Sequence, residues 1–269
     1  MSFEAITPTV MGILNCTPDS FSDGGHFLNA DSALAQALLM QHEGADIIDV
    51  GGESTRPGAK RVSVDEELSR IVPVIEKIKR SSDVRISVDT SKAEVMHEAL
   101  ALGVDMINDV NAFEAEGTLD AVASSSCQLC LMHKKGLPEV MQHNPLYYDV
   151  VTEVYDYLKM RIQACADKGI NADRLILDIG FGFGKTVNHN LSLIKHLQRF
   201  TALGPPLLTA VSRKSTIGAV LNRSEADRLT GSLSLAVVAY LNGARFFRVH
   251  DVRQTIDALK MVQVTYQAS

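Results

Sequence analysis

Short apolar runs recur along the whole chain, and each stops at a polar residue. Several are rich in Val, Ile and Leu, as strands buried on both faces of a parallel sheet are. The runs cover residues 9–15, 45–52, 85–90, 104–110, 127–133, 174–180, 206–212 and 244–250. We therefore predict eight strands at these positions.

Segments with a helical spacing of apolar residues lie between these runs. Residues 30–44 end on a glycine, residues 64–80 begin with acids and end with bases, and residues 91–103 begin with a serine suited to capping. Eight strand–helix units without a linker predict a TIM (β/α)8 barrel, an α/β fold, as a single domain over residues 1–269. A doubly wound parallel sheet uses the same units and is the alternative. The absence of a midpoint where the strand order would switch favours the barrel.

Composition and charge narrow the classes of partner. The 269 residues are 46% hydrophobic and carry a formal net charge of -6, which argues against a nucleic-acid-binding surface. No apolar stretch approaches the roughly 18 residues of a membrane span. The first ten residues, MSFEAITPTV, lack the basic and apolar regions of a signal peptide. We expect small-molecule substrates, with no nucleic acid and no membrane as partners.

The four cysteines are Cys16, Cys127, Cys130 and Cys165. Cys127 and Cys130 form a CxxC pair, but a spacing of three within a strand puts the two thiols on opposite faces. No second pair is present that would complete a zinc site. Free thiols are typical of a reducing compartment, so we expect a cytoplasmic protein.

Polar residues stand at or just past the ends of the predicted strands. In a TIM barrel these ends converge on one mouth, where the active site lies. Asp109 and Asp251 are equally well explained as helix N-caps, a common position for Asp. The complete set is Asn15, Glu53, Asp89, Asn108, Asp109, His133, Asp178, Ser212 to Lys214, and Arg248 to Asp251.

The two signs of charge at this mouth indicate two parts of one ligand. Lys214 and Arg248 come from the last two strands, where barrels often bind phosphate, and arginine can clasp a phosphate with two hydrogen bonds. Asp89, Asn108 and Asp178 can accept hydrogen bonds from a flat heterocycle rich in N–H groups, partners that buried carboxylates need. A ligand with a donor-rich head and a diphosphate tail would satisfy both sets.

The glycine-rich stretch DIGFGFGK, residues 178–185, matches no nucleotide-binding motif. A Walker A loop requires glycine where the chain has Ile179, and the spacing GxGxG is not the dinucleotide pattern GxGxxG. We expect its glycines to let the backbone approach a ligand closely. Phe181 and Phe183 are candidates for an aromatic wall, although either one could belong to the core.

Eight motifs together resemble the dihydropteroate synthases of folate biosynthesis, over residues 11–252. They are MGILNCTPDSFSDGG (11–25), GGESTRPGA (51–59), SVDTSK (87–92), MINDV (106–110), LMH (131–133), DIGFGFGK (178–185), SRKS (212–215) and RVHDV (248–252). The resemblance implies a TIM barrel that joins (7,8-dihydropterin-6-yl)methyl diphosphate to p-aminobenzoate, uses Mg²⁺, forms a homodimer and binds sulfonamides at its aminobenzoate site. Ile179 departs from the family's proline, which would stiffen this turn.

The resemblance also implies a role for individual residues. Asp89, Asp23 and Lys214 are assigned to catalysis, with Asp89 stabilising a cationic pterin ring and Asp23 in a loop that closes over the substrates. The pterin pocket is assigned to Asp89, Asn108, Met132, Asp178, Gly182 and Lys214. The diphosphate site is assigned to Asn15, Arg56, Arg248 and His250, with Asn15 also linked to Mg²⁺. The aminobenzoate site is assigned to Phe21, Thr55, Pro57, Phe183 and Ser212.

Two other functions share the pterin pocket. One is a barrel that transfers a methyl group from a folate to a corrinoid protein, which would not need the complete loops TPDSFSDGG and STRPGA. The other is a paralogue that binds pterins without turnover. Fold alone does not separate these alternatives.

Overall fold

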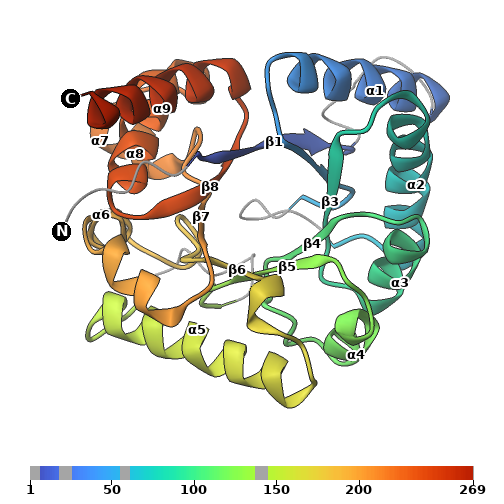
Figure 1. Cartoon of the computed structure of the whole chain (residues 1–269), viewed down its shortest axis with the longest axis horizontal. Helices are drawn as coiled ribbons and strands as arrows, with labels where there is room; N and C mark the ends of the chain where they lie inside the picture. The colour runs from blue at the N-terminus through green and yellow to red at the C-terminus, as the bar shows by residue number, and fades with distance from the viewer. Residues whose placement is uncertain (1–6, 18–25, 55–60, 137–144, 269) are drawn as a thin grey trace.

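Eight parallel strands close into a barrel in chain order, with β1 hydrogen-bonded to β8 and the helices outside (Figure 1). The structure is a computed structural model that describes residues 7–17, 26–54, 61–136 and 145–268. All eight strands lie within the predicted ranges, so the TIM barrel is confirmed and the doubly wound sheet is wrong. The strands are β1 Thr9–Asn15, β2 Ile47–Gly51, β3 Arg85–Asp89, β4 Met106–Asp109, β5 Gln128–Met132, β6 Leu175–Asp178, β7 Leu207–Thr209 and β8 Ala244–Val249.

Helices follow every strand in the described ranges, and two of them follow β7. They are α1 His26–His42, α2 Val64–Ser81, α3 Ala93–Ala101, α4 Thr118–Ala123, α5 Val150–Asp167, α6 Val187–Lys195, α7 Ser215–Leu221, α8 Leu229–Leu241 and α9 Val252–Gln267. Short 3-10 turns occur at Ala172–Arg174, Leu197–Leu203 and Glu225–Asp227. None of the helices described is long and apolar enough to cross a membrane.

The start of α3 corrects one expectation. Ser91 does not cap this helix, which begins after Lys92 without a side-chain cap. Its hydroxyl instead donates to the Asp109 carboxylate at the end of the neighbouring strand. By contrast, α2 has a side-chain cap, because Ser63 Oγ accepts the Glu66 N–H at 3.1 Å. A hydroxyl can satisfy either kind of partner, and the packing of β3 beside β4 decides between them.

The core has two layers, one inside the barrel and one between the strands and the helices. The two thiols of the CxxC pair lie in different layers, Cys130 in the interior and Cys127 in the outer layer, as their spacing predicts. All four cysteines are buried and free. The interior cluster consists of Met11, Ile47, Met106, Cys130, Ile176, Leu208, Ala210 and Phe246.

The strand register decides which polar ends become neighbours. Asp89 pairs with Asn108 across β3 and β4, and Met132 pairs with Asp178 across β5 and β6. Successive side chains of a strand point to opposite faces, so inward positions recur every second residue. The inward polar side chains therefore lie above the apolar interior cluster, at the carboxyl ends of the strands.

Candidate active site

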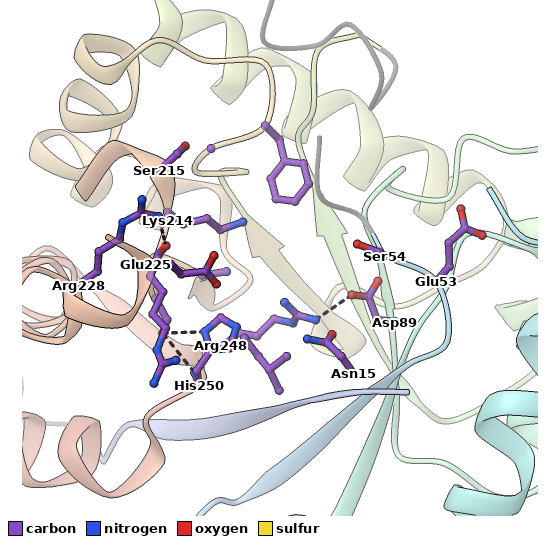
Figure 2. A pocket seen from close by; sticks show the side chains of 16 residues that line it. Asn15, Glu53, Ser54, Asp89, Lys214, Ser215, Glu225, Arg228, Arg248 and His250 are labelled. Carbon is purple, nitrogen blue, oxygen red and sulfur yellow. Dashed lines mark hydrogen bonds and ion pairs between the residues drawn. The ribbon is translucent and has the colours of Figure 1, made fainter. Parts of the chain in front are cut away.

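A cavity of about 340 Å³ opens at the carboxyl ends of the strands (Figure 2). Its walls come from strands at both ends of the chain, which closure of the barrel brings together. Part of the polar mouth that the sequence predicts thus lines one cavity. Its lining includes these predicted site residues: Asn15, Asp89, Gly182, Phe183, Ser212, Lys214, Arg248 and His250.

Arg248 joins two carboxylates inside the barrel. Its Nε donates to Asp49 Oδ2 at 2.6 Å, and its Nη2 donates to Asp89 Oδ2 at 2.8 Å. The Asn108 amide donates to the same Asp49 oxygen at 3.3 Å. Arg248 therefore lies between β2 and β3 although it comes from β8, and Figure 2 shows it reaching across to Asp89.

Burial sets the charge state of this network. Desolvation raises the pKa of Asp89 to about 7, although the Arg248 guanidinium acts against the rise. Burial acts to lower the pKa of Arg248, but the two carboxylates together hold it above its usual range. Burial also raises the pKa of Asp178. The Gly180 N–H donates to Asp178 Oδ1 at 2.7 Å and partly offsets this rise, because the hydrogen bond favours the ionised carboxylate. The site thus combines a permanent cation with a carboxylate that titrates near neutrality.

The opposite wall places a cation beside an aromatic ring. Lys214 Nζ lies 4.2 Å from the centroid of the Phe183 ring, a cation–π contact. Ser212 Oγ lies 3.0 Å from His250 Nδ1, which links the end of β7 to the end of β8. Phe181 belongs to the outer core, so Phe183 alone of the two provides the expected aromatic wall.

The remaining predicted residues divide into two groups. Met132 packs against Phe183 and pairs with Asp178 across β5 and β6, and Asn108 pairs with Cys130 across β4 and β5. All three predicted residues are buried, and none is among the residues that line this cavity. Ile179, which stands where the family has proline, is fully buried among the apolar side chains of the outer core. Five predictions lie outside the described residues: Phe21, Asp23, Thr55, Arg56 and Pro57.

Two acids offered as possible helix caps have specific partners instead. Asp109 is fully buried and accepts the N–H groups of Asn111 and Phe113, both at 2.8 Å. Asp251 precedes α9 without a side-chain cap, and it pairs with Arg213, whose Nε lies 3.0 Å from Asp251 Oδ2. The Asp109 side chain therefore binds backbone N–H groups just past the end of β4, and the Asp251 carboxylate pairs with Arg213, a residue that lines the cavity.

The sequence did not single out Asp49 or Lys185. Asp49 lies in the middle of an apolar run and is fully buried in β2. An acid is rarely buried without a partner, so its place within an apolar strand was the sequence signal that could have pointed to it. Lys185 is 3% exposed, and its ammonium reaches the carbonyls of Gly180 at 2.8 Å and Phe183 at 3.0 Å, and His133 Nδ1 at 2.9 Å. Burial lowers its pKa below the usual range. It holds the glycine-rich loop against the end of β5.

Gly180 shows why this loop needs glycine. Its φ is +67°, and a Cβ there would lie 1.7 Å from the carbonyl oxygen of His133. We predict that Gly180→Ala lowers the free energy of unfolding by about 3 kcal/mol or more, since backbone must move. Gly204→Ala is the matched control, because Gly204 also has a positive φ of +101° but no atom within 4 Å of its Cβ position. It should cost roughly 1 kcal/mol.

Urea unfolding measures both variants. Equal losses would show that the close approach to His133 is unimportant and that only the backbone conformation matters.

Comparisons with known proteins identify the class to which this barrel belongs. The pterin binding enzyme family matches residues 11–250. Dihydropteroate synthase of Escherichia coli K12 is 49% identical over 267 residues, 99% of this chain and 95% of that protein. Xanthomonas albilineans dihydropteroate synthase, solved with 4-aminobenzoic acid, superposes with a TM-score of 0.93 at 46% identity, covering 98% of this chain and 95% of that one. The Yersinia pestis enzyme, solved with a sulfonamide, also superposes with a TM-score of 0.93 at 46% identity, covering 98% of this chain and 96% of that one.

The chain therefore belongs to the pterin binding enzyme family. Its activity within that family is that of a dihydropteroate synthase, a transferase of folate biosynthesis.

Proposed function

We propose that this site joins the methylene carbon of (7,8-dihydropterin-6-yl)methyl diphosphate to the amine nitrogen of p-aminobenzoate. The carbon–oxygen bond to diphosphate breaks, the carbon–nitrogen bond forms, and the amine loses one proton, giving 7,8-dihydropteroate and diphosphate. The observation that carries the proposal is that the cavity is lined by a carboxylate and by cationic side chains. A buried carboxylate, Asp89, lines it on one side, and Lys214 and His250 line it on the other, with Arg248 reaching across to Asp89 (Figure 2).

The pterin ring is assigned to the side of β3, β4 and β6. Asp89 lines the cavity there, and Asn108 and Asp178 carry acceptor oxygens at the ends of β4 and β6; all three are buried, with exposed fractions of 6%, 5% and 3%. As the carbon–oxygen bond lengthens, positive charge spreads over the electron-rich ring. A preorganised carboxylate in a site from which water is excluded stabilises such charge strongly, so Asp89 is the residue placed to lower the barrier.

The diphosphate is assigned to Asn15, Arg248 and His250, which line the same cavity. Mg²⁺ commonly takes only one or two protein oxygens and completes its shell with phosphate oxygens and water. The Asn15 side-chain oxygen suits this mode, and within the described ranges no cluster of three His, Cys, Asp or Glu side chains could hold a metal alone. When bound, the cation would neutralise charge on the departing diphosphate.

The p-aminobenzoate is assigned to Phe183, Ser212 and Lys214. The Phe183 ring can pack against the benzene ring, and the Lys214 ammonium beside it can pair with the carboxylate. An arylamine is neutral at pH 7 and needs no strong base, so orientation of its nitrogen is the main contribution of this wall.

Product formation tests the proposal directly. Purified protein with Mg²⁺ and both substrates should give 7,8-dihydropteroate by chromatography. A chelator should stop the reaction and added Mg²⁺ should restore it. Pterin binding by calorimetry without any product would overturn the proposal and favour a barrel that binds pterins for another purpose.

The pH dependence of kcat/KM reports the charge of Asp89. Because the pKa of Asp89 is raised to about 7 and the ionised form is the active one, kcat/KM should fall as pH drops below about 7. The measurement is kcat/KM for the pterin substrate between pH 5.5 and 8.5, a range chosen to bracket the pKa of about 7. A flat profile across this range would show that Asp89 does not titrate in the free enzyme.

We also infer a homodimer in the cytoplasm. Helices α6, α7 and α8 pack against one another, and their outer sides carry six large exposed hydrophobic residues, Val187, Leu191, Val220, Leu221, Val238 and Leu241. Large exposed apolar residues gathered on neighbouring helices are typical of an interface. Sedimentation should give about twice the chain mass of 29.2 kDa, and Leu221→Glu should shift the sedimenting mass towards that of one chain.

The cytoplasmic location is inferred from the cysteines. Four free, buried cysteines support a reducing compartment.

A further inference from the structure

Two loops that line the cavity from different strands meet at one buried amide. The loop after β6 carries Gly182 and Phe183, and the loop after β7 carries Ser212 and Lys214 before it enters α7. Neither loop belongs to the sheet or to a helix over these residues. Their relative position must therefore come from contacts outside the barrel ladder.

Asn190 of α6 makes those contacts. Its side chain is buried, with 1% exposed, and its Oδ1 accepts the Gly182 N–H at 2.8 Å. Its Nδ2 donates to Thr216 Oγ1 at 3.0 Å and to the Lys185 carbonyl at 3.4 Å. Thr216 is the second residue of α7 and is 4% exposed. One amide thus bridges the glycine-rich loop and the first turn of α7.

The bridged residues flank the wall assigned to p-aminobenzoate. A Cβ on Gly182 would lie 3.3 Å from Lys214 Cδ, so the two loops are already in close contact. The neighbouring Phe183 ring lies 4.2 Å from Lys214 Nζ. A shift of either loop would change the separation between this ring and this ammonium.

We propose that Asn190 is a positioning residue that holds Phe183 and Lys214 at the separation required to bind the aromatic amine. This inference rests on the proposed function of the site. Asn190 touches no substrate; it acts through the Gly182 N–H and Thr216.

The chemistry of the amide explains why asparagine suits this position. It offers an acceptor to the backbone and a donor to a hydroxyl at the same time. Aspartate would keep the acceptor, and the Thr216 hydroxyl could rotate to donate to its second oxygen. Leucine has the same branched skeleton of heavy atoms but would leave the Gly182 N–H without its partner.

Steady-state kinetics of three variants tests the inference. Asn190→Leu should raise KM for p-aminobenzoate by about tenfold, while Asn190→Asp should stay within about threefold of the wild type. Asn188→Leu is the matched control, since Asn188 is exposed on the same helix, and it should match the wild type. Equal losses of kcat in both Asn190 variants, with KM unchanged, would overturn the inference and leave Asn190 a purely structural role.

Thr216→Val keeps the test decisive if Asn190→Leu folds poorly. It removes one end of the bridge and should raise KM for p-aminobenzoate by roughly threefold, and the double variant should be no worse than Asn190→Leu. An unchanged KM in Thr216→Val would overturn the coupling. Failure of the proposed function looks different, because wild type and Asn188→Leu would then make no product either.

Discussion

Replacing Asp89 by asparagine is expected to lower kcat by about 10²–10³-fold while the barrel remains folded. The amide oxygen can still accept the hydrogen bond from Arg248 Nη2, now 2.8 Å from the carboxylate, and Arg248 keeps its pair with Asp49. The negative charge beside the developing pterin cation is lost. Steady-state turnover measured by product chromatography at pH 8 reports the effect.

The Asp89→Asn variant should keep or gain stability although it loses turnover. The pKa of Asp89 is about 7 when folded and 3.8 when unfolded, so the folded state binds the proton more tightly. Stability contributed by this group is therefore lost as pH rises from about 4 to about 7, and at pH 8 the ionised carboxylate is a cost. The neutral amide of the Asp89→Asn variant carries no such cost, so its unfolding midpoint at pH 8 should equal or exceed that of the wild type.

Asp83→Asn is the matched control for Asp89. Asp83 is an exposed acid just before β3, and its replacement should leave kcat unchanged. Near-normal turnover in Asp89→Asn, or a loss of turnover that follows a loss of folded protein, would refute the catalytic role.

Replacing Arg248 by methionine should cost about 3–5 kcal/mol of unfolding free energy at pH 8, because it leaves two buried carboxylates without a cation. Asp49 is fully buried and Asp89 is 6% exposed, so water solvates the two carboxylates poorly once the guanidinium is removed. The loss should be smaller at pH 6. There Asp89, whose pKa is already raised to about 7, takes up a proton and no longer needs a partner.

Urea unfolding at the two pH values measures the effect, with Arg245→Met as control. Arg245 lies on the same strand but faces outward, where its guanidinium lies 5.7 Å from the Tyr240 ring centroid. Its replacement should change stability by less than about 1 kcal/mol at either pH. If both variants lost the same amount, or if Arg248→Met were equally unstable at pH 6 and pH 8, unpaired carboxylates would not be the cause.

The strands were predictable because their pattern does not depend on their partners. A strand buried on both faces needs a continuous apolar run whichever neighbours it has, so all eight were located from residues alone. Helices were less certain at their ends. Ser91 looks like a cap in the sequence, yet in the fold it donates to Asp109, a partner on the next strand.

The sequence predicted many of the residues that form the site, but it did not predict which of them contact one another. Polar residues that end apolar runs must gather at the mouth of a parallel barrel, and eight of the predicted residues line one cavity. The pairing of Arg248 with Asp49, which is 199 residues away in the chain, had no signal in sequence spacing. Asp49 was overlooked for that reason, since an acid within an apolar run becomes meaningful only once its partner is known.

The order of residues alone was enough to specify the barrel, the polar mouth and, through its motifs, the family. The arrangement of the charges emerged only from the folded chain. In the folded chain Arg248 pairs with Asp89, Lys185 binds carbonyls of the glycine-rich loop, and Asn190 bridges two loops. The difference arises because periodicity follows from burial, a property of each segment. Hydrogen bonds and ion pairs depend on distances of about 3 Å between residues that only register and closure bring together.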